Sequence, residues 1–172
     1  YFSTSNSDHS IVILTDGYTA GDNILYIWRK GMAERQLLYG IPMEKRAKDQ
    51  QVKPSNIGTC NFTPNEKGLL FRSNIFNDEG SASYLPLDNP ANVTEVPIIG
   101  IQHKGVGELV DIRLVESNIF LVEYNIDGCS WMYECQLHED EASMRLEVKR
   151  ALCGLPPLDE GVSPRCRDGA AL

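Results

Sequence analysis

The sequence lacks the features that define several large classes of protein. No apolar run approaches the roughly 20 residues that a membrane-spanning helix needs, and no run of Lys or Arg is longer than a pair. The formal net charge is -8, so the basic face with which proteins bind nucleic acid is missing. These absences favour a soluble, folded domain, and we expect neither nucleic acid nor a membrane among its partners.

Cysteine is sparse and irregularly spaced. No two cysteines form a C-x-x-C pair, so their spacing indicates neither a zinc site nor a disulfide framework. We therefore expect reduced, mostly buried thiols in a cytoplasmic protein, with no metal and no cofactor. The five cysteines are Cys60, Cys129, Cys135, Cys153 and Cys166.

Short β-rich runs separated by turn residues are abundant. Residues 1–10 are polar and aperiodic, which predicts a frayed end or a linker. A three-stranded meander is expected at 11–40. Residues 43–51 are charged and lack an apolar stripe, so we expect a solvated excursion with one or two helical turns rather than a core helix. The strands of the meander are expected at 11–14, 24–29 and 35–39.

The same pattern returns twice, with four strands each time. The second unit is expected at 58–99 and the third at 108–150, so the three units together occupy 11–154. The tail at 155–172 is rich in Pro and Gly, which indicates a linker; with the start at Tyr1, it suggests a piece of a longer polypeptide. The strands are expected at 59–62, 69–73, 83–87 and 93–99, and then at 108–114, 119–124, 131–137 and 144–150.

Two sets of marker residues support a true repeat. One set lies in the second strand of each unit, the other lies in the third strand, and the intervals within the two sets are nearly equal. Four short antiparallel strands recurring every roughly 40 to 50 residues are typical of β-propeller blades. The predicted fold is all-β: a partial β-propeller of about three four-stranded antiparallel blades, with a β-sandwich as the alternative. The markers are Ile11, Leu69 and Ile119, and Tyr26, Tyr84 and Tyr133.

Three blades do not close a ring, because closed propellers have roughly four to eight. The first unit, moreover, is expected to lack its first strand. We therefore expect a fragment of a larger propeller, or one that neighbouring chains complete. Exposed blade faces and strand edges then predict self-association.

The second unit resembles a known blade repeat. It reads Phe62-Thr63-Pro64-Asn65-Glu66-Lys67-Gly68, then the apolar strand Leu69-Leu70-Phe71, then Arg72-Ser73-Asn74. This is similar to the repeat of TolB-type propellers, which also forms the N-terminal propeller of prolyl oligopeptidase and dipeptidyl peptidase type serine peptidases. The resemblance covers most of 11–154, although residues 114–118 replace the usual Pro-Asp-Gly turn in the third unit.

The resemblance implies a non-catalytic propeller that restricts substrate access to a separate α/β-hydrolase domain. That domain would carry a G-x-S-x-G nucleophile elbow. The closest stretches here, 128–132 and 161–165, both lack the second glycine. We therefore expect no catalytic residue in this chain, while the resemblance implies a serine peptidase for the parent protein.

Few other residues suggest a site. His103 and Lys104 are candidates for lining a propeller channel, with a surface loop as the alternative. His138 precedes an acidic run at 139–141, for which we expect a solvated loop rather than a metal or acid–base site. Asp127 and Gly128 are adjacent, which is the wrong spacing for the aspartate box of sialidases, so we expect a plain hairpin turn with a residue at positive φ.

Three functions remain open from the sequence. The first is the access-restricting propeller, whose partner is the α/β-hydrolase domain of the parent chain. The second is a stand-alone TolB-like propeller that binds a protein partner. The third is a sialidase-like propeller that acts on glycans, which the failed aspartate box disfavours.

Overall fold

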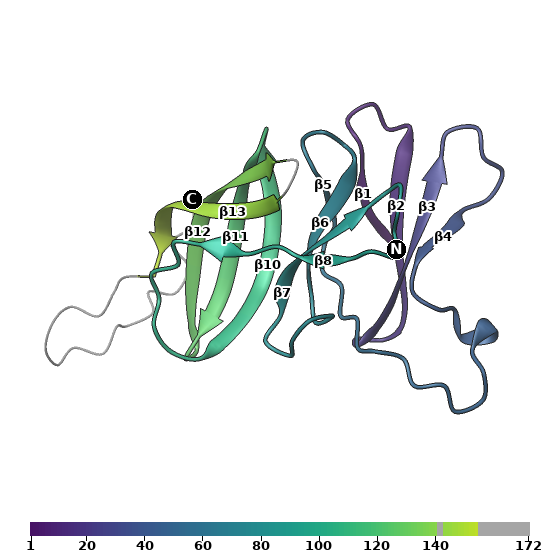
Figure 1. Ribbon diagram of the computed structural model, residues 1–172, viewed down its shortest axis with the longest axis horizontal. Helices are drawn as coiled ribbons and strands as arrows, with labels where there is room; N and C mark the ends of the chain where they lie inside the picture. The colour runs from purple at the N-terminus through teal and green to yellow at the C-terminus, as the bar shows by residue number, and fades with distance from the viewer. Residues whose placement is uncertain (141–142, 155–172) are drawn as a thin grey trace, which may run out of the picture. The chain divides into compact units, whose positions relative to one another are not determined.

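The computed structural model describes residues 1–140 and 143–154. These residues form thirteen strands and one short 3-10 helix, and the strands make three sheets (Figure 1). The chain divides into two compact units, Tyr1–Val96 and a second that begins at Pro97. The predicted tail at 155–172 lies outside the described residues.

The first sheet contains four strands in chain order, each antiparallel to the next. The prediction that residues 1–10 are a frayed end or a linker is wrong for the strand at Phe2–Ser5, which supplies the first strand that this unit was expected to lack. Ser and Thr give this strand no apolar pattern, and it forms because it pairs along the next strand. The strands are β1 (Phe2–Ser5), β2 (Ile11–Thr19), β3 (Asp22–Arg29) and β4 (Gln36–Tyr39).

The second sheet repeats this order. Its four strands are again sequential and antiparallel. Fully buried apolar residues from both sheets form one core, which includes Ile13 and Leu25 from the first sheet and Leu69, Phe71 and Leu85 from the second. The first unit is therefore held together by apolar packing between its two sheets. The second sheet comprises β5 (Asn61–Phe62), β6 (Gly68–Ser73), β7 (Ser81–Pro86) and β8 (Thr94–Glu95).

The third sheet is larger. Four sequential antiparallel strands are joined by a fifth, β9, which pairs in parallel with the last strand. The single strand predicted at 93–99 is therefore wrong: β8 belongs to the second sheet and β9 to the third. Pro97 lies between them and has no N–H to continue a ladder. The strands are β9 (Ile98–Ile99), β10 (Gly107–Glu116), β11 (Ile119–Ile126), β12 (Cys129–Asp140) and β13 (Ser143–Cys153).

The turn between β11 and β12 has two residues. Ile126 pairs with Cys129, and the intervening Asp127 and Gly128 have φ values of 50° and 79°. Two consecutive residues at positive φ define the type I′ turn that suits the twist of a hairpin. The prediction of a positive-φ hairpin turn is confirmed.

The third sheet has one apolar and one charged face. Leu109, Ile112, Phe120, Val122 and Tyr133 are at most 1% exposed and share one face. The opposite face carries rows of polar residues. Some are joined by ion pairs, either directly across the two strands, as in Arg150–Glu134, or diagonally, as in Arg145–Asp140. Such alternation of apolar and polar residues is expected for a sheet with one solvated face.

The cysteines depart from the prediction in part. Cys60 and Cys135 are free and buried, as expected, and Cys153 is free but exposed. Cys129 is disulfide-bonded, so the expectation of reduced thiols is wrong for it. The cytoplasmic localisation rested on reduced thiols and stays a prediction.

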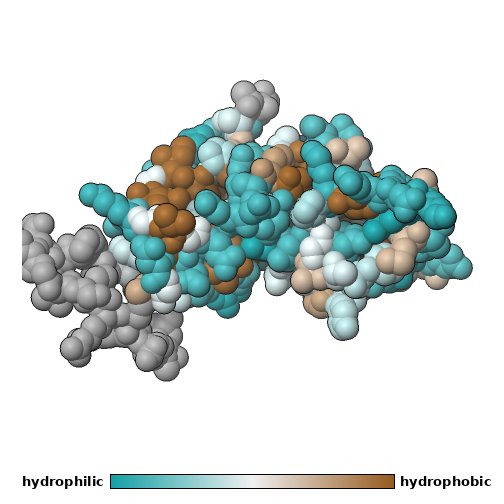
Figure 2. Space-filling view, turned by 90° about the horizontal axis from the view of Figure 1, so that it is seen from below, coloured by the Kyte–Doolittle hydropathy of each residue, from teal (hydrophilic) through white to brown (hydrophobic). Residues whose placement is uncertain are grey.

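The described residues contain no helix with the length and apolar composition to cross a membrane. Large apolar side chains still reach the surface, among them Phe2 (67% exposed) and Val106 (74% exposed). Figure 2 shows apolar patches within a mostly hydrophilic surface.

Candidate functional site

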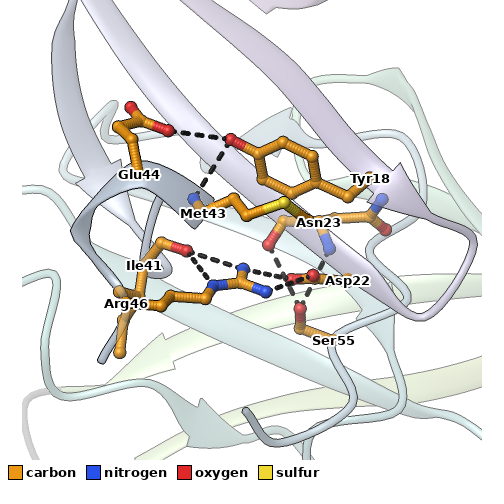
Figure 3. A network of polar contacts seen from close by, with 8 residues as sticks. All are labelled: Tyr18, Asp22, Asn23, Ile41, Met43, Glu44, Arg46 and Ser55. Carbon is orange, nitrogen blue, oxygen red and sulfur yellow. Dashed lines mark hydrogen bonds and ion pairs between the residues drawn. The ribbon is translucent and has the colours of Figure 1, made fainter. Parts of the chain in front are cut away.

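The excursion between β4 and β5 is solvated, as predicted, and contains a single turn of 3-10 helix, η1 (Met43–Lys45). The sequence did not predict that both of its ends are fixed to the first sheet. These attachments form the polar network of Figure 3. A pocket lies beside them.

The first attachment is an ion pair between Arg46 and Asp22 at the start of β3. Two parallel hydrogen bonds of 2.6 Å and 2.7 Å join the guanidinium to the carboxylate, and the two side chains are only 14% and 18% exposed. The guanidinium also donates to the carbonyl oxygen of Ile41 over 2.8 Å and 2.6 Å. The hydrogen bonds from Arg46 lower the pKa of Asp22 below its usual value, and those to Asp22 raise the pKa of Arg46.

Tyr18 extends this attachment. Its hydroxyl accepts a hydrogen bond from the Met43 backbone N–H and donates one to Glu44 Oε2, each 3.1 Å long. The guanidinium carbon of Arg46 lies 5.4 Å from the centre of the Tyr18 ring, within range of a cation–π contact. The 3-10 turn is thus fixed over the β2–β3 hairpin.

The second attachment is at Ser55, at the far end of the excursion. Its hydroxyl accepts from the Asn23 N–H and donates to the Asn23 carbonyl oxygen, both over 3.1 Å. Asn23 Oδ1 in turn accepts from the N–H of Ile57 over 2.7 Å. Asp22 and Asn23 therefore hold the two ends of the excursion from adjacent positions.

A pocket of about 480 Å³ lies beside these attachments. Its lining comes from strand β4 and the residues that follow it, from residues 51–53 in the returning part of the excursion, and from residues 22, 23, 55, 90 and 91. The volume lies within the range of small-ligand pockets, roughly 300–1,000 Å³. Its lining is mostly apolar and includes Leu37, Tyr39, Ile41, Val52, Lys53 and Pro90.

His103, one of the two predicted candidates, is packed in an aromatic cluster of the second unit. Its ring centre lies 4.7 Å from that of Tyr124, 5.7 Å from Trp131 and 5.8 Å from Tyr133. The Tyr133 hydroxyl accepts from the His103 N–H over 3.0 Å and lies 2.9 Å from His103 Nδ1. Burial lowers the pKa of His103, so the neutral ring is favoured. Lys104, by contrast, is exposed.

The tyrosine and cysteine side chains around His103 stay protonated and are therefore poor nucleophiles or bases. Burial raises the pKa of Tyr124 far above its usual value and raises the pKa of the Cys135 thiol to about 12. The backbone at Gly154 lies against the Trp131 indole so closely that a Cβ there would overlap it. The cluster therefore fixes the segment around His103 by packing, and the channel role of His103 and Lys104 stays a prediction.

The described part of the acidic run after His138 is a strand and not a loop. His138, Glu139 and Asp140 belong to strand β12, so the predicted solvated loop is wrong for them, and position 141 lies outside the described residues. His138 Nε2 lies 2.9 Å from Glu147 Oε2 on the neighbouring strand. Cross-strand pairing with β13 carries the strand through this charged stretch.

Metal-binding geometry is not found in the part of the chain that the structure describes. No three His, Cys, Asp or Glu side chains of residues 1–140 and 143–154 come together. Asp127 lies in the hairpin turn, whereas Trp131 is 6% exposed and belongs to the buried face of β12.

Three sheets of sequential antiparallel strands, with a fifth strand added to the third, place the chain in the all-β class and fit the predicted partial propeller as well as its alternative, a β-sandwich. Of the solved structures, one from work on two prolyl endopeptidases and the role of inter-domain dynamics in their catalysis and specificity is similar, with a TM-score of 0.60 and 12% identity. The match covers 91% of this chain but 20% of that chain, so it shows a shared fold over a fifth of a longer protein. No protein-family model and no curated protein matches the chain.

The candidate site was missed by sequence reasoning. Asp22 and Arg46 lie far apart in sequence and follow no motif, and the pocket depends on how the excursion folds back. The only sequence signal was the charge of residues 43–51. It correctly indicated that this segment is solvated, but it did not indicate that Arg46 pairs with Asp22.

Proposed function

We propose that this chain is a non-catalytic propeller segment of a prolyl oligopeptidase-like serine hydrolase. The observation that carries the proposal is the match of 91% of the chain to a prolyl endopeptidase structure with a TM-score of 0.60. The resemblance of the sequence around Phe62 and Pro64 to the blade repeat of this family also supports it.

In this function the blades restrict access to an α/β-hydrolase domain. The chain itself contains no G-x-S-x-G elbow. In the described part Ser5 Oγ lies 2.8 Å from His9 Nδ1, but this contact is exposed and no described carboxylate contacts the His9 ring to complete a triad. The contribution of the chain is therefore steric: rigid sheets exclude large folded substrates and admit short or flexible peptides.

The complete coding sequence of the gene tests the proposal. We expect the same reading frame to encode an α/β-hydrolase domain with G-x-S-x-G followed by an acidic residue and a histidine. A frame without such a domain would contradict the proposal. The 172-residue chain alone should hydrolyse neither peptide nor ester substrates, and turnover abolished by a single Ser or His substitution would show a catalytic site within it.

A TolB-like propeller that binds a protein partner is the second candidate. The observation that favours it is the pocket beside β4, which needs no hydrolase domain. Affinity purification of the full-length gene product separates the two candidates. A stable protein partner without hydrolase activity supports the second, and peptidase activity supports the first.

We also propose that the first sheet is where another copy or another blade packs. One register row crosses all four strands of this sheet on the face opposite the core, and every member is apolar or aromatic. Phe2 and Leu37 in this row are 67% and 41% exposed. A face of this composition gains free energy when another sheet covers it. The row is Phe2, Leu14, Tyr26 and Leu37.

A further inference from the structure

Strand β4 has a free edge at the pocket. It is the last strand in the order of the first sheet and pairs only with β3. Beyond that pairing, the backbone of residues 36–39 makes no hydrogen bond to any other described residue. In an antiparallel strand the remaining N–H and C=O groups point away from the sheet, where they can pair with an added strand.

Another part of the lining, residues 51–53, also has unpaired backbone. Residues 51–53 have no regular secondary structure, and their backbone groups hydrogen-bond to no part of the chain that the structure describes. Pro54 follows them and donates no N–H. The pocket lining thus includes two segments with main-chain groups that have no hydrogen-bond partner among the described residues.

The side chains around the pocket define the chemistry of a ligand. Leu37, Ile41 and Val52 supply apolar surface, and Leu37 and Ile41 are 41% and 38% exposed. Lys53 is exposed and forms no ion pair with the residues described, whereas the Asp22 carboxylate is already bound by Arg46. The charge available to a ligand is therefore positive.

The attachments of the excursion restrain part of the pocket lining. The Arg46–Asp22 pair holds one end of the excursion and Ser55 holds the other. Since residues 51–53 lie between these two points in the sequence, the attachments limit how far this segment can move away from the first sheet. A segment that is restrained in this way loses less conformational entropy on binding.

We infer that this pocket binds an extended peptide, which adds as a strand to the free edge of β4. An apolar side chain of the peptide packs on Leu37 and Val52, and a carboxylate of the peptide pairs with Lys53. Main-chain hydrogen bonds supply affinity that is independent of sequence, and the side-chain contacts supply selectivity, as in other cases of strand addition. The inference holds whether or not a hydrolase domain is attached.

The binding experiment uses the full 172-residue chain and fluorescein-labelled peptides of alternating Val and Thr. One peptide carries a central Glu and an amidated C-terminus, and a second has no Glu and a free C-terminal carboxylate. Saturable binding of the first alone identifies a side-chain carboxylate as the ligand of Lys53, and binding of the second alone identifies a chain terminus. Methylation of alternate peptide nitrogens should weaken binding by about tenfold or more, because it removes the donors to β4.

Substitutions locate the site. Lys53→Glu should weaken binding of the acidic peptide by about tenfold and favour a matched peptide with Lys in place of Glu. Lys48→Glu is the matched control, because Lys48 is an exposed lysine of the same excursion that does not line the pocket. An equal loss for both variants would show a non-specific charge effect and overturn the inference.

NMR chemical-shift mapping shows where on the chain the peptide binds. Binding at the inferred site shifts the amide resonances of residues 37–41 and 51–53, whereas shifts confined to other residues would overturn the inference. Absence of saturable binding by either peptide would overturn it as well. If the peptide dissociates a self-associated form without shifting the amide resonances of residues 51–53, it acts at the exposed row of the first sheet and not at the pocket, and the inference is wrong.

Discussion

The first and third sheets each have a buried apolar face, but their opposite faces differ. In the first sheet the opposite face presents the row Phe2, Leu14, Tyr26 and Leu37. In the third sheet the corresponding row of Arg113, Leu121, Glu134 and Arg150 is charged except for one leucine. The difference indicates that the first sheet is suited to pack on both faces, while the third has one face suited to water.

The Arg46–Asp22 ion pair of the first unit is more buried than the Arg150–Glu134 ion pair of the third sheet. Arg46 and Asp22 are 14% and 18% exposed and form two short hydrogen bonds. On the third sheet, Arg150 is 67% exposed and Glu134 is 27% exposed. We therefore expect the first pair to hold a segment in place, and the second mainly to keep a face soluble.

The largest expected effect is on the free energy of unfolding, and it distinguishes Phe120 from Leu121, two adjacent residues on opposite faces of the third sheet. Phe120→Ala should lower the free energy of unfolding by about 3–5 kcal/mol, because Phe120 is fully buried. Leu121→Ala on the charged face should cost about 1 kcal/mol, since Leu121 is only half-buried. Urea denaturation monitored by tryptophan fluorescence measures both. Equal costs would mean that the charged face is also packed.

The next prediction compares two half-buried leucines at corresponding positions. Leu14→Gln removes an apolar contact from the exposed row of the first sheet and should raise the dissociation constant for self-association by about tenfold, roughly 1.4 kcal/mol. Leu121→Gln changes the charged face of the third sheet and should leave self-association unaltered. Light scattering over a concentration series provides the comparison, and a larger effect at Leu121 would reverse the assignment of the two faces.

A smaller effect is expected from pH. Because Arg46 lowers the folded-state pKa of Asp22, the pair stabilises the fold above the unfolded value of 3.8 and loses this contribution as pH falls through the folded value. Asp22→Asn should therefore expose residues 40–55 to protease at neutral pH and flatten the pH dependence of stability in the acid range. Asp49→Asn, at an exposed position of the same excursion, is the control and should change neither property.

The smallest effect is expected at the Arg150–Glu134 pair. A double-mutant cycle with Arg150→Gln and Glu134→Gln should give a coupling energy of roughly 0.2–1 kcal/mol that decreases with added salt. A larger, salt-independent coupling would indicate that this face is shielded from water.

Much of the fold could be predicted because local patterns agree with the tertiary structure. Three recurring antiparallel units were correct, and the Asp127-Gly128 turn followed from the need for positive φ. The register of the repeat was only partly correct. Tyr26 lies opposite Leu14 and Tyr133 opposite Val122, each three residues after its marker, but Tyr84 lies opposite Leu70, one residue after Leu69.

The remaining errors have physical causes. Strand β1 consists of Phe, Ser and Thr, and its pairing with β2 rather than its own periodicity makes it a strand. The expected strand at 93–99 is divided at Pro97 because the residues before it pair with the second sheet and those after it pair with the third. The sequence does not show this pairing. The pocket depends on contacts between Asp22 and Arg46, which lie far apart in the chain, and single-sequence patterns contain no information on such a pair.

Sedimentation velocity of the unmodified chain over a range of concentrations tests most directly whether the exposed row of the first sheet is a packing face. We predict a sedimentation coefficient that rises with concentration, as the apolar faces of two or more copies come together. A single species with the mass of one 172-residue chain at all concentrations would contradict this. It would show that the first sheet, like the third, has a face that is stable in water.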